Sequence, residues 1–289
     1  MNSPILLIDS SHWFYQLVFK MPSLSTEDRQ TGIIFGMMLK TIGHAKKLSS
    51  NKFIFCFDSK KNHRKAIFPE YKKKRNKQER TPEEIQIFKD SFIQLNEFRM
   101  QVLPQLGIKN AFIQTGRESD DILASIVFDN PEQEFIIVSN DHDMFQLLSD
   151  KVKMYNSKTE KFYTKQNFID EWGIEPKQWA EALSYCGCST DEVPGIAGIG
   201  YKTYCKYLRG ELKENSKKYQ DIVSEEGKKI AARNEKLVKL TFEGTDKFVI
   251  DENWDLDMKD YIRVCDKYDF RSLLQGDNYE KWQTIMCGK

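Results

Sequence analysis

Three short hydrophobic runs in the first half of the chain each lead into aspartate, and this repetition limits what the chain can fold into. The runs cover residues 5–8, 53–57 and 135–138. Continuous apolar runs that alternate with helical patterns are typical of parallel strands buried on both faces. We therefore predict an α/β fold with a mostly parallel sheet flanked by helices.

The aspartates that follow these runs are candidates for a metal site. They are Asp9, Asp58, Asp141 and Asp143, and a further acidic cluster of Glu118, Asp120 and Asp121 opens a predicted helix. Because the carboxyl ends of parallel strands share one edge of a sheet, these side chains should converge, and their repulsion then requires multivalent cations. Each aspartate alone is equally well explained as a helix N-cap. Asp141 and Asp143 share one loop, however, and a helix needs only one cap.

A basic segment follows the second run. Between Lys60 and Arg80 the chain has ten basic residues and two acidic ones. Such a run is usually a solvated face or a loop. Here it begins two residues after Asp58, so it would overhang the acidic site. A phosphodiester backbone is the ligand that both features would share.

Composition excludes several other classes of protein. The chain has 289 residues, of which 40% are hydrophobic and 30% charged, as in globular proteins. No apolar run approaches the roughly eighteen residues of a membrane span, and no signal peptide is recognisable. The six cysteines lack paired metal-ligand spacing, and Cys186 and Cys188 form only a lone C-x-C pair. We expect reduced thiols and a cytoplasmic protein.

The chain is expected to have two domains, an α/β domain over residues 1–165 and a mainly helical domain over residues 166–289. Within the first, residues 31–48 predict one helix, and Thr81 begins another that ends at Gly107. Residues 154–155 and 162–164 predict an edge hairpin.

The second domain contains a glycine-rich turn before a predicted helix. Gly198 and Gly200 permit a tight turn whose backbone N–H groups face an anion. Lys202 and Lys206 follow on one face of the helix, which suits sequence-independent capture of duplex phosphates. An ordinary turn between helices explains the two glycines equally well.

Six motifs occur in the order in which the 5′-nuclease family has them. They are Asp9; Asp58; Tyr71-Lys72-Lys73-Lys74-Arg75; Gly116-Arg117-Glu118-Ser119-Asp120-Asp121; Ser139-Asn140-Asp141-His142-Asp143-Met144; and Asp191-Glu192-Val193-Pro194-Gly195 with Gly198-Ile199-Gly200-Tyr201-Lys202-Thr203. Over nearly the whole chain to residue 210, the sequence resembles this family. The family includes phage 5′–3′ exonucleases, flap endonucleases and the 5′-nuclease domain of bacterial DNA polymerase I.

The resemblance implies a PIN-like fold with a basic helical arch over residues 60–106 and a C-terminal region of the helix-hairpin-helix (H3TH) type. The metal ligands that it implies are Asp9, Asp58, Glu118, Asp120, Asp121, Asp141, Asp143 and Asp191. Two divalent ions about 4 Å apart would activate a water and stabilise the leaving oxygen. Mg²⁺ is expected, with Mn²⁺ as a substitute, because hard oxygen ligands favour these ions over zinc. Lys72 and Arg75 would act with Asp141 and Asp143 in catalysis, by neutralising charge on the scissile phosphate.

The resemblance also implies DNA contacts and substrates. The implied DNA-binding residues are Arg64, Tyr71, Lys72, Arg75, Gly198, Gly200, Lys202, Thr203 and Lys206, with a potassium ion at the Gly198–Gly200 turn. The expected activities are 5′–3′ exonuclease and flap endonuclease on DNA, extending to RNA primers in RNA/DNA hybrids, in replication or repair. We expect a monomer of phage or bacterial origin.

One position departs from the family. Bacterial and phage members often read Gly-Asp-x-x-Asp before the proline, whereas this chain has Cys188 in place of the first aspartate. The second metal ion is then expected to bind more weakly. The alternative function is a non-catalytic, structure-selective DNA-binding protein with a degenerate metal site. A ribonuclease with a similar acidic core is a third candidate, disfavoured because such domains commonly lack the glycine turn.

Overall fold

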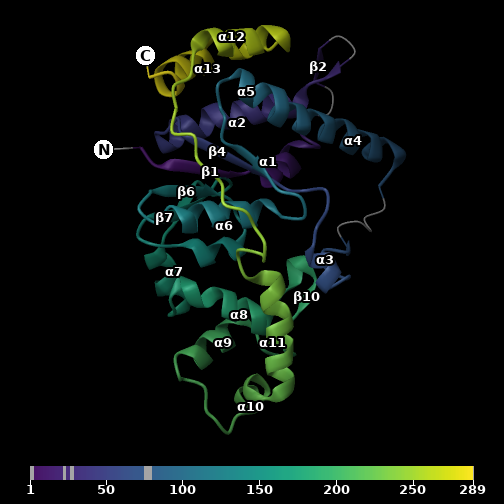
Figure 1. Ribbon diagram of the computed structural model, residues 1–289, viewed down its shortest axis with the longest axis vertical. Helices are drawn as coiled ribbons and strands as arrows, with labels where there is room; N and C mark the ends of the chain where they lie inside the picture. The colour runs from purple at the N-terminus through teal and green to yellow at the C-terminus, as the bar shows by residue number, and fades with distance from the viewer. Residues whose placement is uncertain (1–2, 22–23, 27–28, 75–79, 289) are drawn as a thin grey trace. The chain divides into compact units, whose positions relative to one another are not determined.

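The computed structural model describes residues 3–21, 24–26, 29–74 and 80–288 (Figure 1). The chain forms two compact units that interleave in sequence. The first comprises Met1–Phe57, Glu79–Phe112 and Val249–Lys289, and the second comprises Asp58–Gln78 and Ile113–Phe248. Each unit therefore draws on segments far apart in sequence, and the division into an α/β domain to residue 165 and a helical domain beyond it stays a prediction.

The first unit contains the first two predicted strands. Strand β1 (Ile5–Asp9) pairs in parallel with β4 (Phe53–Phe57), with Leu6 opposite Phe53 and Asp9 opposite Cys56. Both strands are buried along their whole length, which explains their unbroken apolar sequence. A short antiparallel pair, β2 (Ser25–Thr26) and β3 (Arg29–Gln30), lies farther along the chain.

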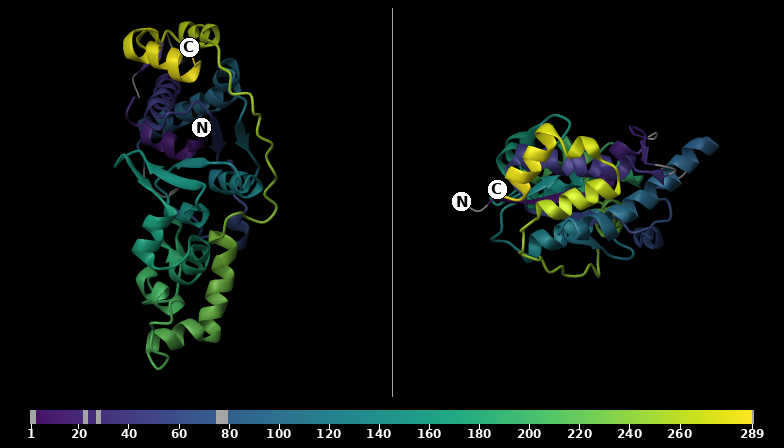
Figure 2. Two further views of the ribbon diagram at one scale, coloured as in Figure 1. Left: turned by 90° about the vertical axis from the view of Figure 1, so that its left-hand side faces the viewer. Right: turned by 90° about the horizontal axis from the view of Figure 1, so that it is seen from above.

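Helices complete the first unit. They are α1 (Ser10–Leu17), α2 (Gly32–Leu48), α4 (Pro82–Glu97), which continues through a π turn η2 (Phe98–Val102) into α5 (Leu103–Gln105), then α12 (Met258–Lys267), η6 (Arg271–Leu273), α13 (Gly276–Lys281) and η7 (Trp282–Met286). The predicted helix start at Thr81 is confirmed, with the Thr81 side chain accepting from the Glu84 N–H in a capping box. The C-terminal α13 and η7 pack against α2 (Figure 2). Contacts between α2, in the N-terminal part of the chain, and the C-terminal helices therefore help to build this unit.

The second unit carries the third predicted strand. Strand β6 (Phe135–Val138) pairs in parallel with β7 (Val152–Asn156), and β7 pairs antiparallel with β8 (Lys161–Tyr163), so the predicted hairpin is confirmed. The short β5 (Ala111–Ile113) spans the boundary between the units. Helices α3 (Arg64–Ile67) and α6 (Ser119–Asp129) also belong to the second unit. The predicted fold class, α/β with mostly parallel strands flanked by helices, is confirmed.

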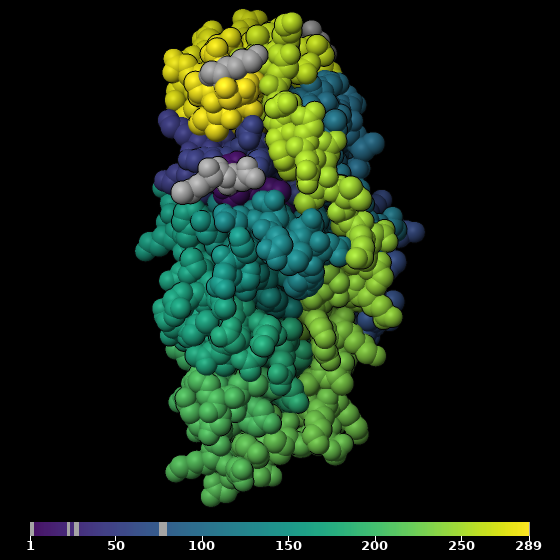
Figure 3. All heavy atoms as spheres, turned by 60° about the vertical axis from the view of Figure 1, so that its left-hand side comes forward, coloured from purple at the N-terminus to yellow at the C-terminus, as the bar shows by residue number. Residues whose placement is uncertain are grey.

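The rest of the second unit is mainly helical. Its elements are η3 (His142–Leu147), α7 (Lys165–Trp172), η4 (Pro176–Gln178), α8 (Trp179–Cys186), β9 (Gly187–Cys188), η5 (Ser189–Asp191), β10 (Val193–Pro194), α9 (Tyr201–Leu208), α10 (Lys217–Val223) and α11 (Glu225–Val238). Helices α8 and α11 pack side by side, and the surface is continuous from the teal strands to these green helices (Figures 1 and 3). Among the residues described, no helix has the length and apolar character needed to cross a membrane.

Asn234 on α11 ties the helices of the second unit together and generates a stability prediction. It is fully buried, and its Nδ2 donates to the carbonyls of Ser184 and Pro194, both at 2.9 Å. Arg233 also donates to the Pro194 carbonyl, so that carbonyl keeps a donor in Asn234→Ala. The Ser184 carbonyl loses the donor that Asn234 supplies, and the shorter side chain leaves a cavity. We expect the free energy of unfolding to fall by roughly 2 kcal/mol, measured by urea denaturation. Lys229→Ala, at an exposed position of α11, is the control; equal losses for the two variants would contradict the prediction.

Candidate metal and nucleic-acid site

The first turn of α6 is bound by a residue far upstream. The Asp58 Oδ1 accepts from the Ser119 N–H at 2.8 Å, and Asp121 Oδ2 accepts from the Glu118 N–H at 3.2 Å. Asp120 lies in the same first turn. Carboxylates are favourable there because the first N–H groups of a helix have no partner within it. The acidic motif and the aspartate after β4 therefore meet at one helix end.

The loop after β6 presents two further carboxylates. Asp141 caps η3, its Oδ1 accepting from the Asp143 N–H at 2.9 Å. The indole Nε1 of Trp179 donates to the His142 carbonyl at 2.9 Å, and Phe145 packs on Trp179 with ring centroids 5.7 Å apart. Side chains from α8 and η3 thus fix the backbone from which both carboxylates project.

The N-cap interpretation of the aspartates is also right in part. Asp9, in the first unit, caps α1 by accepting from the His12 N–H at 3.0 Å through Oδ1. Asp141 does the same for η3. A cap bond engages one oxygen of a carboxylate, which has two oxygens and about four lone-pair positions. Capping and metal binding are therefore compatible at both residues.

A tight hairpin brings a cysteine and an aspartate beside this loop. Strands β9 and β10 pair antiparallel, with Cys188 opposite Val193, and η5 between them carries Asp191. Gly187 has a φ of +73°, and a Cβ there would lie 2.3 Å from the Gly195 nitrogen, so this close approach requires glycine. One ligand atom each from Asp143, Cys188 and Asp191 lies within 4.8 Å of the others.

Negative charge accumulates in this group. Burial, with the charges of Asp141 and Asp191, raises the pKa of the Asp143 carboxyl well above its usual value. Burial, with the charges of Asp143 and Asp191, raises the pKa of the Cys188 thiol to about 12. The Cys188 Sγ is 3.0 Å from the Thr190 hydroxyl. A cation bound among Asp143, Cys188 and Asp191 would lower both pKa values, because it favours the negatively charged forms.

Lys72 and Tyr71 hold two carboxylates together. The Lys72 Nζ lies 2.6 Å from Glu118 Oε1 and 3.4 Å from Asp191 Oδ2. The Tyr71 phenol oxygen lies 2.8 Å from Glu118 Oε2 and 2.9 Å from Asp191 Oδ2, so one hydroxyl hydrogen serves two carboxylates. The Lys72 backbone N–H also donates to the Asp191 carbonyl, at 3.0 Å. The motif at residues 71–72 is thus part of the acidic site.

Glu118 shows how these cations act on the site. Burial alone would raise the pKa of its carboxyl, but the charges of Lys72 and Arg64 outweigh burial and lower it to about 2. The amide of Asn62 adds a hydrogen bond to Oε1 at 3.0 Å. Sequence reasoning missed Asn62, which stands within the basic run and carries no motif of its own. Glu118 is therefore ionised while Asp143 resists ionisation.

Arg64, expected to contact DNA, pairs with an aspartate in this structure. It is buried, and its guanidinium donates to both oxygens of Asp121, at 2.6 and 2.8 Å. Its Nε donates to the Leu237 carbonyl at 2.7 Å. Asp121 in turn is fully buried and accepts from the Phe242 N–H at 2.8 Å. The pair is a buried ion pair. Arg64 as a DNA contact and Asp121 as a metal ligand both stay predictions.

Two other expected DNA contacts also need comment. Tyr71 is buried, and its hydroxyl lies on the carboxylates and positions them, so its contact with DNA stays a prediction. Its neighbours Lys73 and Lys74 are exposed. Arg75, expected to act on the scissile phosphate, lies outside the described residues.

The glycine turn lies before α9. Gly198 has a φ of +77°, as a tight turn requires, and Gly200 is the N-cap of α9. Lys202 and Lys206 are exposed and four residues apart, hence on one face of the helix. Thr203 lies between them in sequence, in the first turn, where its N–H donates to the Gly200 carbonyl at 2.9 Å.

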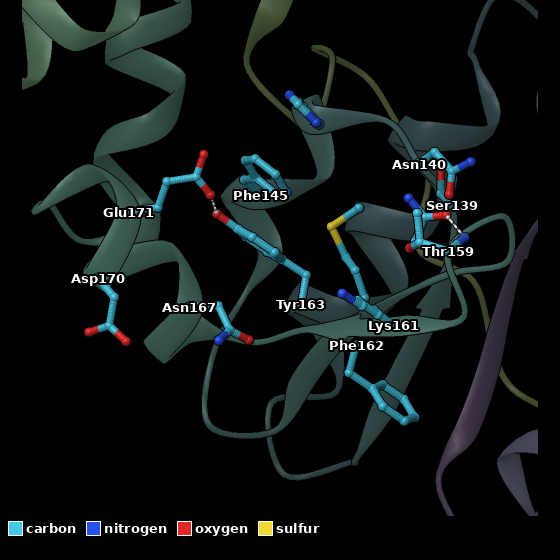
Figure 4. A pocket seen from close by; sticks show the side chains of 13 residues that line it. Ser139, Asn140, Phe145, Thr159, Lys161, Phe162, Tyr163, Asn167, Asp170 and Glu171 are labelled. Atoms are coloured by element: carbon cyan, nitrogen blue, oxygen red, sulfur yellow. Dashed lines mark hydrogen bonds between the residues drawn. The ribbon is translucent and has the colours of Figure 1, made fainter.

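A groove of about 600 Å³ adjoins the acidic loop without containing its carboxylates. Its lining includes His142, and in Figure 4 Ser139 and Asn140 lie on one side of it and Tyr163 on another. In Figure 4 the Tyr163 hydroxyl points to Glu171, to which it donates at 2.6 Å. Asp141 and Asp143 are not among the lining residues, so this groove is separate from the acidic group.

Comparison with known proteins assigns the family. The model of the 5′-3′ exonuclease N-terminal resolvase-like domain matches residues 4–173. The 5′-3′ exonuclease of Buchnera aphidicola from Schizaphis graminum is 32% identical over 252 residues, 83% of this chain and 84% of the relative.

Solved structures share the fold. The bacteriophage T5 D15 protein, co-crystallised with metal ions, has a TM-score of 0.68 at 23% identity, over 81% of this chain and 88% of that one. The T5 D15 flap endonuclease in a pseudo-enzyme–product complex with DNA and metal ions has a TM-score of 0.66 at 21% identity, over the same shares. With a family model over more than half of its length and a relative 32% identical, the chain belongs to the 5′-3′ exonuclease family.

Proposed function

We propose that the chain is a divalent-metal-dependent, structure-specific 5′–3′ nuclease that cleaves phosphodiester bonds of DNA at 5′ ends and flap junctions. The observation that carries this proposal is the joint placement of Glu118, Asp191 and Lys72, with contacts of 2.6 and 3.4 Å between them. A cluster of carboxylates that also contains a lysine can bind metal ions through the carboxylates and a phosphate through the lysine ammonium. The similarity to a flap endonuclease solved with DNA and metal ions supports the substrate class.

The acidic residues fit divalent ions. Burial and, after it, the charges of Asp141 and Asp191 raise the pKa of Asp143, and three donor atoms lie within 4.8 Å of one another. We propose two Mg²⁺ ions, which Mn²⁺ can replace, held among Asp58, Glu118, Asp120, Asp141, Asp143 and Asp191. Asp9 and Asp121 are proposed as metal ligands on the resemblance alone. When bound, such ions stabilise the negative charge that develops on the attacking and leaving oxygens.

Lys72 is proposed as the phosphate-binding cation within the described residues. Its ammonium already lies against Glu118 and Asp191 in this structure. Divalent ions would take over the neutralisation of these carboxylates, and the ammonium could then bind a phosphate oxygen. Arg75 is proposed for the same phosphate on the resemblance alone.

The duplex is proposed to bind at the start of α9. The Gly198–Gly200 turn, Thr203 and the exposed Lys202 and Lys206 would hold the phosphate backbone, with a potassium ion at the turn. The basic segment after Asp58 is proposed as the arch that guides the 5′ single strand. We further propose activity on RNA primers in RNA/DNA hybrids, a role in replication or repair, and a monomer. A cytoplasmic location is proposed because the spacing of the six cysteines does not indicate a disulfide framework.

Asp141→Asn tests the nuclease against a non-catalytic DNA-binding protein. Asparagine keeps an oxygen that can cap η3, so the loop should remain folded while the charge is lost. We expect cleavage of a labelled 5′-flap duplex in Mg²⁺ to fall more than about 100-fold, with DNA affinity retained. Gel-based cleavage and binding assays measure both, with EDTA as the metal-free control. Tight binding by the wild type without cleavage in Mg²⁺ or Mn²⁺ would support the binding protein.

Cys188→Asp tests the departure from the family. It restores an oxygen ligand beside Asp143 and Asp191, so we expect half-maximal cleavage at a lower Mg²⁺ concentration than in the wild type. A magnesium titration of flap cleavage measures this, with Cys186→Ser as the control for altering a nearby thiol. An identical titration for Cys188→Asp and wild type would show that this position does not contact the metal.

Asp143→Asn tests the charge excess without DNA. In metal-free protein the folded-state pKa of Asp143 is raised, so its ionisation opposes folding once the pH exceeds the unfolded value of about 3.9. The variant should therefore unfold at a higher urea concentration than the wild type in EDTA at neutral pH. The gain should vanish near pH 4, where the unfolded chain also keeps the proton. A stability loss at neutral pH in EDTA would contradict the charge argument.

A further inference from the structure

Cys188 lies beside two carboxylates in the second unit. It is buried, and its Sγ belongs to the group of three donor atoms with Asp143 and Asp191. Within the described part of the chain, no other group of three His, Cys, Asp or Glu side chains comes this close together. Its backbone belongs to the hairpin of β9 and β10, where Gly187 and Gly195 approach so closely that neither position has room for a side chain.

The donor set differs in kind from an all-oxygen site. Mg²⁺ prefers oxygen ligands and sheds its waters reluctantly, whereas sulfur is a soft ligand that selects ions such as Zn²⁺. Two carboxylates and one thiolate also place three negative charges around an ion. Coordination would exchange the S–H bond of Cys188 for a metal–sulfur bond and release the proton to solvent. A thiophilic ion gains from this exchange, and Mg²⁺ gains little.

We propose that Asp143, Cys188 and Asp191 form a mixed thiolate–carboxylate site that takes a thiophilic divalent ion, such as Co²⁺, Zn²⁺ or Cd²⁺, in preference to Mg²⁺. Cys188 is then the residue that decides which ion occupies this part of the site. The inference rests on the proposed function, since it uses two of the same carboxylates, but it makes a separate claim about metal selectivity.

Cobalt titration reads the metal–sulfur bond directly and without DNA. Full-length protein is stripped with EDTA, dialysed and titrated with Co²⁺, while near-ultraviolet absorption is recorded for sulfur-to-cobalt charge transfer. The band is expected in the wild type and in Cys186→Ser, whose changed thiol is two residues away, and is expected to be absent in Cys188→Ser. No band in the wild type, or a band that persists in Cys188→Ser, overturns the proposal.

Calorimetric titration supplies a second measurement that does not depend on a deleted ligand. Cys188→Asp keeps a metal ligand at this position but replaces sulfur with oxygen. The ratio of Mg²⁺ to Cd²⁺ dissociation constants should fall at least about tenfold in this variant relative to the wild type. An unchanged ratio overturns the proposal, and circular dichroism checks that the variant is folded.

Failure of this inference and failure of the proposed nuclease function give different results. A charge-transfer band in a protein that does not cut the 5′-flap duplex would keep the sulfur site and overturn the nuclease. Flap cleavage in Mg²⁺ by a protein without the band would support the nuclease and overturn the sulfur site.

Discussion

The arrangement of the second unit depends on one electrostatic constraint, the gathering of carboxylates that cannot lie close together unpaired. Lys72 and Tyr71 hold Glu118 and Asp191 together through contacts of 2.6 to 3.4 Å. This pairing keeps Glu118 ionised, whereas burial and the charges of Asp141 and Asp191 disfavour ionisation of Asp143. The site is thus partly neutralised on one side and over-charged on the other. Such asymmetry is what a site for bound cations requires.

A buried ion pair secures the neutralised side. Arg64 binds both oxygens of Asp121 and reaches the Leu237 carbonyl, and Asp121 accepts from the backbone of Phe242. These contacts join the segment after β4, the start of α6 and the end of α11. Breaking one partner of such a pair leaves an uncompensated buried charge, which is strongly destabilising. Positioning of the functional carboxylates therefore relies on charges that do not themselves reach solvent.

Sulfur at position 188 changes the chemistry of the over-charged side without changing its shape. The backbone of β9 and β10 holds Cys188 where Asp143 and Asp191 are nearest. A protein of the 5′-3′ exonuclease family with this group combines the metal-dependent cleavage proposed here with a preference for softer ions. Metal availability would then tune its activity, since selectivity among divalent ions follows ligand type as well as raw affinity.

The sequence by itself determined the fold class, the buried strands β1, β4 and β6, the capped start of α4 and the family, because period, turn chemistry and ordered motifs are local. It also marked Cys188 as a departure. Only the tertiary structure decided that the side chains of Arg64 and Tyr71 lie against carboxylates, and that Asn62 supports Glu118. It likewise showed two units that interleave in sequence. Partners separated by tens of residues make these contacts, and a charged side chain reads the same in sequence whether it meets solvent or a buried counter-ion.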